Sequence, residues 1–454
     1  MIKQGFLRGC LGLGAVLLVL LFSACDEPSD RSSDKKTFDA KAASAALVHD
    51  AYIWQRVWTS AVGQAVQEAT PVVRQWRILA AQTSSKQQLR QFEPDWQVLA
   101  TSGKPVLAVV RIDGQLQDFD QDEMRTQMIA LYQAWLLKGA EYGVAVVGLE
   151  VDYDCGTQRL IAYAGFLQHL KKSLHAVDKG KGTLSITALP DWLNAQELED
   201  VLAAVDYSVL QVHSVVDPAQ GGLFNAQVAK HWVKAYARRS AESGQSFLVA
   251  LPNYGSRVSW DRNGRITAVT SEAPIPGGGV DAQGSAQELF ANPQEISNFL
   301  QQGLDYQAMP ELKGVAWFRL PTAQDERSWA MPTWLAVMRG EPLRARVGVA
   351  LVPSPDDAAF YRVVLQNTGE VDVVLPARVN LPKTCTYADG VRANGYTLQY
   401  DDAKGNGVKS NDTKGGAMFL QKQDQSLLKA GQQSEIGWAR CPVNVNMDLP
   451  VQNF

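Results

Sequence analysis

The stretch Val144–Asp154, VAVVGLEVDYD, decides how this chain folds. It begins as a nearly unbroken apolar run, which is typical of a strand buried on both faces of a parallel sheet. It ends with acidic residues at alternate positions, Glu150, Asp152 and Asp154. Because side chains on a strand alternate between its two faces, these three carboxylates are predicted to project the same way. They stand at the carboxyl end of the strand, where α/β folds place their binding sites.

Strand and helix patterns alternate on both sides of this stretch. Seven further apolar runs are predicted strands: Ala51–Val57, Arg77–Ala81, Pro105–Ile112, Thr183–Leu189, Tyr207–Ser214, Phe247–Tyr254 and Gly314–Leu320. Helical patterns lie between them, at Glu123–Glu141, Leu160–Leu174, Ala226–Glu242, Pro293–Gln302 and Glu326–Arg339. Eight strands alternating with helices predict an α/β fold, a (β/α)8 TIM-like barrel. A doubly wound open sheet is the alternative, and the lack of a Gly-rich phosphate loop after the first strand disfavours it.

The connection after the seventh predicted strand is unusually long. Asn263-Gly264 stands there between alternating apolar residues, which is a strong signal for a two-residue hairpin turn. A run of three glycines, Gly277–Gly279, follows before the next helix. An insertion at this point of a barrel is expected to cover the face that carries the acidic residues.

The residue pattern changes near Arg346, from alternating strand and helix patterns to short strand patterns alone. Short alternating runs such as VGVALVPS and SEIGWARC, separated by Gly, Asn and Asp, predict a small antiparallel β-sandwich. It resembles the immunoglobulin-like accessory modules that follow catalytic barrels in secreted bacterial proteins. We therefore expect a barrel over residues 48–342 and a sandwich domain without a catalytic site over residues 343–454.

The first residues indicate export. Basic residues precede a short apolar core, and small residues lead to Cys25, which is the layout of a secretory signal. LFSAC resembles the lipobox of bacterial lipoproteins, so Cys25 is expected to be lipidated. The alternative is a spanning helix, but the apolar run falls short of the roughly 20 residues that a bilayer requires. We expect a signal peptide over residues 1–24, a flexible tether over residues 25–47, and a periplasmic protein held by lipid to the inner or outer membrane.

Composition and cysteine usage limit the partners. A formal net charge of -4 with mixed signs leaves no basic stripe for nucleic acid. The histidines have no ligand spacing, so neither a metal nor another cofactor is expected. Cys385 and Cys441 lie in the same region of an exported protein, which predicts a disulfide between them. Cys155 is expected to be a small buried residue.

Motifs at the strand ends resemble those of family-18 chitinase-like glycoside hydrolases. GLEVDYD at 148–154 is similar to the DGxDxDxE signature of that family's fourth strand, and DYSVLQVHS at 206–214 to its sixth-strand DYxxxMxYD. ALPNYGSRVSW at 250–260 is similar to the seventh-strand PFYGR segment, and GVAWFRL at 314–320 to the last strand with its tryptophan. The chain as a whole also resembles a bacterial family of exported proteins known as a domain of unknown function (DUF family 3142).

The chitinase-like resemblance implies a barrel that acts on or binds a glycan with acetamido sugars. It implies that Asp154 protonates the glycosidic oxygen and that Asp152 positions the acetamido group of the substrate. Glu150 is the third catalytic candidate. Because three clustered acids cannot all ionise at low cost, at least one of their pKa values is expected to rise, as a general acid requires.

Substrate-binding residues are expected around the same rim. They are Trp54, Trp58, Arg111, Gln211, His213, Tyr254 and Trp317. Flat aromatic rings suit the C–H faces of sugar rings, and Gln211 and His213 share one face of the sixth strand. The structural alternative is that the aromatic residues belong to the core, and that Arg111, Arg56 or Arg319 pairs with Glu150 or Asp152.

Two other functions remain open at this level. One is a non-catalytic protein that binds carbohydrate or envelope polysaccharide and has lost the acid. The other is a scaffold in an envelope assembly, with the sandwich as its contact surface.

Overall fold

The computed structural model describes residues 47–83, 88–114, 119–213, 223–271, 285–401, 407–408, 417–422 and 425–443. The signal peptide, the tether up to residue 46 and the lipidation site Cys25 lie outside the described residues, and so does the glycine run Gly277–Gly279. Within the described ranges, no helix has both the length and the apolar character needed to cross a membrane.

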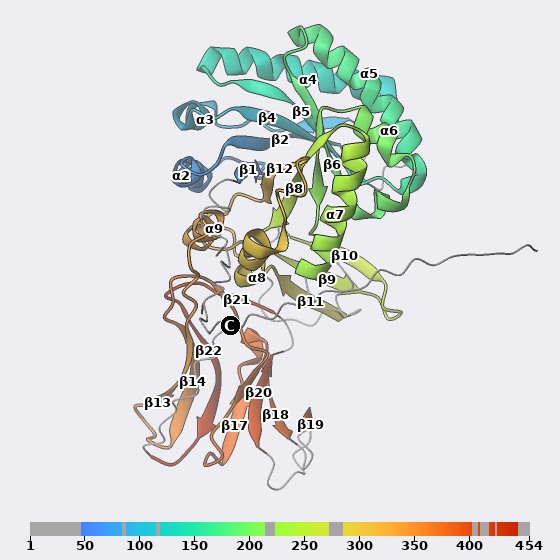
Figure 1. Cartoon of the computed structure of the whole chain (residues 1–454). Helices are drawn as coiled ribbons and strands as arrows, with labels where there is room; N and C mark the ends of the chain where they lie inside the picture. Colours follow the sequence, from blue (N-terminus) through green and yellow to red (C-terminus); the bar gives the residue numbers. More distant parts are fainter. Residues whose placement is uncertain are drawn as a thin grey trace, which may run out of the picture. The chain divides into compact units, whose positions relative to one another are not determined.

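A closed barrel of parallel strands occupies the first part of the described chain (Figure 1). Its strands are β1 (Val48–Ile53), β2 (Gln75–Thr83), β4 (Val106–Ile112), β5 (Val146–Tyr153), β6 (Thr183–Ala188), β7 (Tyr207–Gln211), β8 (Ser246–Pro252) and β12 (Leu312–Phe318). The sheet closes because β1 pairs in parallel with both β2 and β12. A short strand, β3 (Leu89–Gln91), adds to β2 in antiparallel orientation. The predicted (β/α)8 TIM-like fold is confirmed, and each predicted strand overlaps an observed one.

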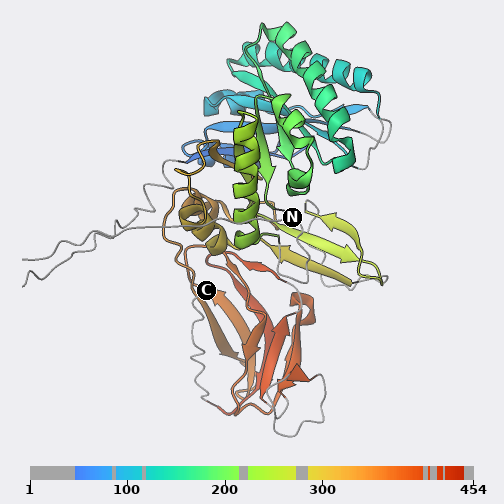
Figure 2. The ribbon, with the colours of Figure 1, turned by 45° about the vertical axis from the view of Figure 1, so that its right-hand side comes forward.

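Helices surround the barrel strands (Figures 1 and 2). They are α2 (Ser60–Ala69), α3 (Trp96–Ser102), α4 (Gln121–Tyr142), α5 (Leu160–Asp178), α6 (Leu198–Ala203), α7 (Ala226–Glu242), α8 (Pro293–Asn298) and α9 (Met331–Met338). The sequence patterns miss the short helices α2, α3 and α6, whereas the equally short α8 and α9 lie within predicted helical segments. Their buried faces and the outward side chains of the strands form one continuous core.

The long connection after β8 forms a small antiparallel sheet of its own (Figure 2). Its strands are β9 (Gly255–Trp260), β10 (Ile266–Thr270) and β11 (Ser285–Phe290), in the order β10-β9-β11. The hairpin predicted at Asn263-Gly264 is present, but its turn is longer than two residues. The Asp261 carboxylate accepts hydrogen bonds from the backbone N–H groups of Asn263 and Arg265, which stabilises the wider loop.

The residues after α9 form an antiparallel β-sandwich, as the sequence predicts. One sheet has the order β13-β14-β22-β17, another has the order β16-β20-β18-β19, and β15 pairs with β21. The bounds are β13 (Val347–Pro353), β14 (Phe360–Asn367), β15 (Val373–Val374), β16 (Arg378–Asn380), β17 (Tyr387–Gly390), β18 (Tyr396–Asp401), β19 (Gly407–Val408), β20 (Met418–Lys422), β21 (Leu427–Leu428) and β22 (Gln433–Arg440). Val363, Leu420 and Ile436 belong to the core that the sheets share. A disulfide joins Cys385 to Cys441.

Candidate functional site

The acidic residues at the end of β5, Glu150 and Asp152 in the strand and Asp154 directly after it, face the inside of the barrel. The alternating residues Leu149 and Val151 point outward and belong to the core beneath the helices. Glu150, Asp152 and Asp154 therefore project inward at successive levels, toward side chains of β1, β6 and β7. The geometry predicted from their spacing is confirmed, but the three carboxylates have different surroundings.

Glu150 lies in a sealed network in the barrel interior. Its carboxylate accepts hydrogen bonds from Tyr52 Oη and from Ser185 Oγ, both at 2.6 Å, and forms an ion pair with the Arg77 guanidinium. Arg77 also donates to Asp50 Oδ2 at 2.9 Å. The side chains of Glu150, Arg77 and Asp50 have no exposed surface. Glu150 therefore lies beneath the pocket rather than in it, and its partner is an arginine that the sequence analysis did not single out.

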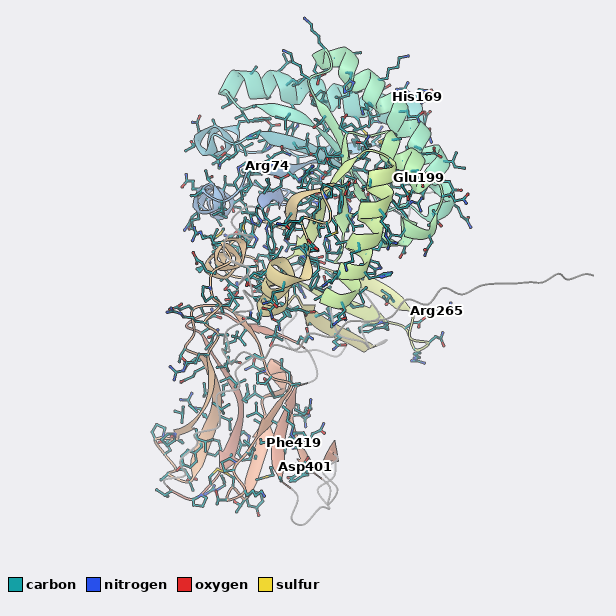
Figure 3. All side chains as sticks on the ribbon, in the orientation of Figure 1. Arg74, His169, Glu199, Arg265, Asp401 and Phe419 are labelled. Carbon is teal, nitrogen blue, oxygen red and sulfur yellow. A yellow bond between two sulfur atoms is a disulfide. The ribbon has the colours of Figure 1, made fainter. Side chains whose placement is uncertain are left out.

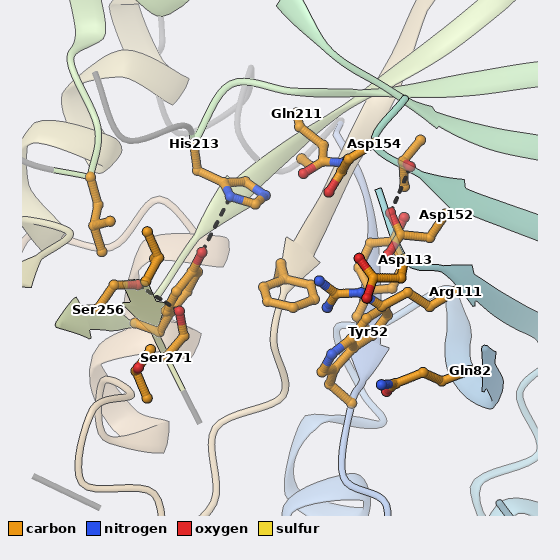
Figure 4. A pocket seen from close by; sticks show the side chains of 18 of the residues that line it. Tyr52, Gln82, Arg111, Asp113, Asp152, Asp154, Gln211, His213, Ser256 and Ser271 are labelled. Carbon is orange, nitrogen blue, oxygen red and sulfur yellow. Dashed lines mark hydrogen bonds between the residues drawn. The ribbon is translucent and has the colours of Figure 1, made fainter. Parts of the chain in front are cut away.

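Asp152 and Asp154 line a pocket at the carboxyl ends of the strands (Figure 4). The cavity measures about 540 Å³. Five of the predicted binding residues line it as well: Trp54, Arg111, Gln211, His213 and Tyr254. Trp58, Trp317 and Glu150 are not among its lining residues.

The two aspartates of the pocket each accept one hydrogen bond, Asp152 from β6 and Asp154 from β7. Thr187 Oγ1 donates to Asp152 at 2.7 Å, and Gln211 Nε2 donates to Asp154 at 3.1 Å. Burial and the nearby Asp154 carboxylate raise the pKa of Asp152 to about 6. Partial removal from water by the surrounding barrel atoms also raises the pKa of Asp154, although its side chain reaches solvent at the pocket mouth. The pair can therefore hold a proton under mildly acidic conditions.

Arg111 is the cation that acts on both aspartates. It lies opposite Asp152 in the pairing of β4 with β5, and its guanidinium stands 5.8 Å from the centre of the Trp54 ring. Its charge lowers the pKa values of Asp152 and Asp154, which opposes the effect of burial. The other two arginines considered from the sequence have different partners: Arg56 donates to Gln82 at 2.7 Å, and Arg319 pairs with Asp325.

Aromatic rings form a wall of the pocket around Phe318. The Phe318 ring centre lies 4.9 Å from that of Trp54, 5.5 Å from that of Tyr254 and 5.7 Å from that of His213. Tyr254 Oη lies 3.3 Å from His213 Nδ1. Burial lowers the pKa of His213 to about 4, so its ring is neutral at neutral pH. Figure 4 shows His213 across the pocket from Asp152 and Arg111.

Trp317 faces the helical layer, which corrects its predicted place at the binding rim. It is fully buried, its Nε1 donates to His49 Nδ1 at 3.1 Å, and its ring lies near those of Trp329 and Trp334. The reason is strand alternation, because the next residue, Phe318, takes the inward position. Trp58 is likewise not in the pocket and packs against the outer core.

The sheet inserted after β8 supplies another wall of the pocket, as its position in the sequence predicts. Ser256, Val269, Thr270 and Ser271 line the cavity. The hydroxyls of Ser256 and Ser271 are 2.6 Å apart, and Arg319 donates to the Ser271 carbonyl at 3.1 Å. The first bond joins the two ends of the β9–β10 hairpin, and the second holds the insertion against the barrel mouth.

A glycine fixes the main chain at Asp154. A Cβ atom at Gly114 would lie 2.7 Å from the Asp154 carbonyl oxygen and 3.2 Å from the Asp154 Cβ. Only glycine allows the loop after β4 to approach Asp154 this closely. Gly114 is therefore a positioning residue for Asp154.

Several residues that line the pocket were not predicted from the sequence. They are Tyr52, Gln82, Asp113, Thr187, Leu223, Ala250 and Phe318, together with the lining residues of the insertion. Alternation along each strand could have found Thr187 and Phe318, because each shares a strand with outward core residues. Within the described part of the chain, no cluster of three or more His, Cys, Asp or Glu side chains could hold a metal ion. His169 is one histidine that lies away from the pocket, because it is exposed on α5 (Figure 3).

Comparisons with protein families match two segments of the chain. Residues 102–323 match the family described as "Domain of unknown function (DUF3142)", which confirms the predicted resemblance over that segment. Residues 350–442 match "Domain of unknown function (DUF8456)". No protein in the curated set matches the chain.

Solved structures similar to this one include chitinases and a spore cortex-lytic enzyme. A chitinase from Chromobacterium violaceum is 15% identical, with a TM-score of 0.43, over 65% of this chain and 99% of that one. The spore cortex-lytic enzyme SleL of Bacillus cereus is 15% identical, with a TM-score of 0.44, over 65% of this chain and 74% of that one. A chitinase from Bacteroides thetaiotaomicron is 14% identical, with a TM-score of 0.40, over 60% of this chain and 89% of that one.

Proposed function

We propose that the pocket binds a glycan with acetamido sugars and hydrolyses its glycosidic bond. One observation carries the proposal: Asp152 and Asp154, two acids with raised pKa values, share an open pocket with a wall of aromatic rings. The motif resemblance of the β5 segment gives these residues their roles. A raised carboxyl pKa keeps a proton available for the leaving group near neutral pH.

In the proposed reaction Asp154 is the general acid. It donates its proton to the glycosidic oxygen as the bond from that oxygen to the anomeric carbon breaks, so the leaving sugar departs as an alcohol. The acetamido oxygen of the substrate bonds to the anomeric carbon, and Asp152 stabilises the positive charge that spreads over this group. A water molecule then adds to the anomeric carbon, opens the new ring and returns a proton to Asp154.

The other pocket residues fit binding roles. Trp54 and Phe318 offer apolar faces to a sugar ring, and Gln211 and Tyr254 offer hydrogen-bonding groups to its hydroxyls. Glu150 has no surface in the pocket, so its proposed role is indirect: it holds the hydroxyl of Tyr52, which lines the cavity.

A second candidate function is carbohydrate binding without catalysis. The observation that favours it is at Asp154, whose side chain is one methylene shorter than the glutamate of the chitinase-like motif and accepts a hydrogen bond from Gln211. Catalysis tolerates displacements of only fractions of an ångström, so a shorter acid can bind without reacting.

The experiment that tests the proposal uses the full-length protein with the hexamer of N-acetylglucosamine and with peptidoglycan fragments. Products are followed by mass spectrometry and affinity by calorimetry. We expect wild type and the exposed-acid control Asp191→Asn to release shorter sugars, and Asp154→Asn to release none. Undetectable turnover in wild type together with unchanged affinity in Asp154→Ala would establish the binding function instead. If neither sugar is bound, both candidates fail.

We also propose that the protein is exported and anchored on the periplasmic side by lipid at Cys25. The layout of the first 25 residues supports this. Wild type should incorporate a radioactive fatty acid in cells and Cys25→Ser should not, while unlabelled wild type would refute the anchor.

A further inference from the structure

Aromatic residues gather on one face of the sandwich sheet that contains β14, β22 and β17. Arg440 of β22 pairs with Phe360 of β14 on one side and with Tyr387 of β17 on the other. Two residues back on β22, Trp438 lies on the same face of the sheet. We call Phe360, Tyr387 and Trp438 the aromatic face.

The aromatic face points to solvent. Its alternating neighbours Tyr361, Ala388 and Ala439 are buried in the sandwich core, so the aromatic side chains project from the opposite side of the sheet. Tyr387 is 67% exposed, which is unusual for a side chain of its size. The rings of Phe360 and Trp438 are stacked, with centres 5.4 Å apart and planes 20° from parallel. The face therefore holds one stacked pair of rings and one separate, exposed ring, with Arg440 between Phe360 and Tyr387 in the strand pairing.

Two ion pairs lie around the aromatic face, together with the carboxylate of Asp389, which is opposite Trp438 in the strand pairing. Arg440 forms an ion pair with Asp357 at 3.1 Å, and Arg362 forms one with Glu435 at 3.4 Å. These balanced pairs favour neither a strongly acidic nor a strongly basic partner, and they leave polar groups next to the rings. A neutral ligand with apolar faces and many hydroxyls, which is the chemistry of a sugar chain, matches both features.

The disulfide holds the edge of the aromatic face in place. Cys385 precedes Tyr387 by two residues, and Cys441 follows Arg440 directly. The bond therefore ties the start of the edge strand β17 to the end of β22, beside the exposed ring. Holding a binding surface in one arrangement reduces the entropy that is lost when a ligand binds.

We propose that the aromatic face is a second carbohydrate-binding site, which takes a neutral polysaccharide chain across β14, β22 and β17. The exposed Tyr387 ring and the uncovered side of the stacked Phe360–Trp438 pair contact the sugar faces, and Arg362 and Asp389, which flank Trp438 in the pairing of the strands, bond the hydroxyls. This inference goes beyond the function proposed for the pocket, because it concerns binding to polymer and requires no catalysis.

The test measures how much full-length protein is removed from solution by insoluble chitin, a neutral polysaccharide. It is done in the Asp154→Asn background, so that turnover in the pocket does not consume the polymer. We expect Tyr387→Ala and Trp438→Ala each to weaken binding about tenfold. Tyr387→Phe, which keeps the ring, and Tyr142→Ala, an exposed aromatic residue of α4, should bind as the parent does.

Four outcomes decide the inference. Ring-dependent binding supports it, even if the barrel proves to have no activity. Binding that is equal in all variants, or no binding to chitin, overturns it. It is also overturned if Tyr387→Ala converts a dimer to a monomer in sedimentation while polymer binding is unchanged, because the face would then bind a second copy of the chain. Tyr387→Ala removes an exposed side chain, so loss of folding is not expected to interfere.

Discussion

Glu150 and the pair Asp152 and Asp154 occupy the same strand and the same side of the barrel, yet their environments are opposite. Glu150 is enclosed, and Arg77, Tyr52 and Ser185 satisfy its carboxylate. Asp152 and Asp154 each accept one hydrogen bond and share the field of one arginine, Arg111. The comparison shows what distinguishes a structural acid from a candidate catalytic acid on the same side of the barrel. It is how completely hydrogen bonds and ion pairs satisfy the carboxylate.

The largest expected effect comes from breaking the buried ion-pair network of Glu150, Arg77 and Asp50. Arg77→Met leaves the buried carboxylates of Glu150 and Asp50 without their shared cation, and should reduce the free energy of unfolding by about 3–5 kcal/mol. The matched control is Arg74→Met, whose side chain also binds Asp50 but is 47% exposed, and which should cost less than about 1 kcal/mol. Urea unfolding measures both, and similar small effects would contradict the account of the sealed network.

In the pocket, removal of a charged side chain should increase the free energy of unfolding rather than reduce it. Asp152 has its pKa raised to about 6, so above pH 6 the folded state carries a charge that it disfavours relative to the unfolded chain. Asp152→Asn should therefore increase the free energy of unfolding above pH 6, by up to about 3 kcal/mol. The gain should shrink as pH falls and vanish below pH 4, where both states of the wild type are protonated. Thermal unfolding across this range tests it, and a loss of stability at pH 7 would count against the environment described.

A smaller effect is expected from shifting Asp154 without removing it. Gly114→Ala places a methyl group against the Asp154 main chain, so turnover should fall about tenfold while glycan affinity changes little. Gly156→Ala is the control, because no atom lies within 4 Å of its added Cβ. The kcat and KM of both variants are measured on the same oligosaccharide. Equal turnover in the two variants would show that Gly114 does not position the acid.

The smallest expected effect tests whether the charge of Arg111 lowers the pKa values of the two pocket aspartates. Arg111→Leu removes the charge that lowers the pKa values of Asp152 and Asp154, so both should rise further. The alkaline limb of the pH–turnover profile should move up by about one pH unit. Arg56→Leu, at the same pocket but hydrogen-bonded to Gln82, should leave the limb in place. A limb that moves equally in both variants would point to a general change in pocket charge.

The sequence predicts which way the three acidic side chains point, but not which partners surround each of them. Alternation along the strand is a local property, so the inward direction of Glu150, Asp152 and Asp154 follows from their spacing alone. The ion pair of Glu150 with Arg77 depends on which strands meet across the barrel, which one strand's pattern does not contain. Trp317 shows a second limit, because its motif match suggested the rim although a shift of one residue reverses the face of a strand.

The coupling of the two pocket acids can be measured without any substrate. Carbon-13 NMR of aspartate-labelled protein follows each carboxyl group through a pH titration. We predict an aspartate with a midpoint near pH 6 that is absent in Asp152→Asn and shifts to lower pH in Asp154→Asn, because the Asp154 charge contributes to the raised pKa. If the Asp152 signal instead titrates near pH 4 in wild type and is unaffected by Asp154→Asn, the pair is not coupled and the central claim is wrong.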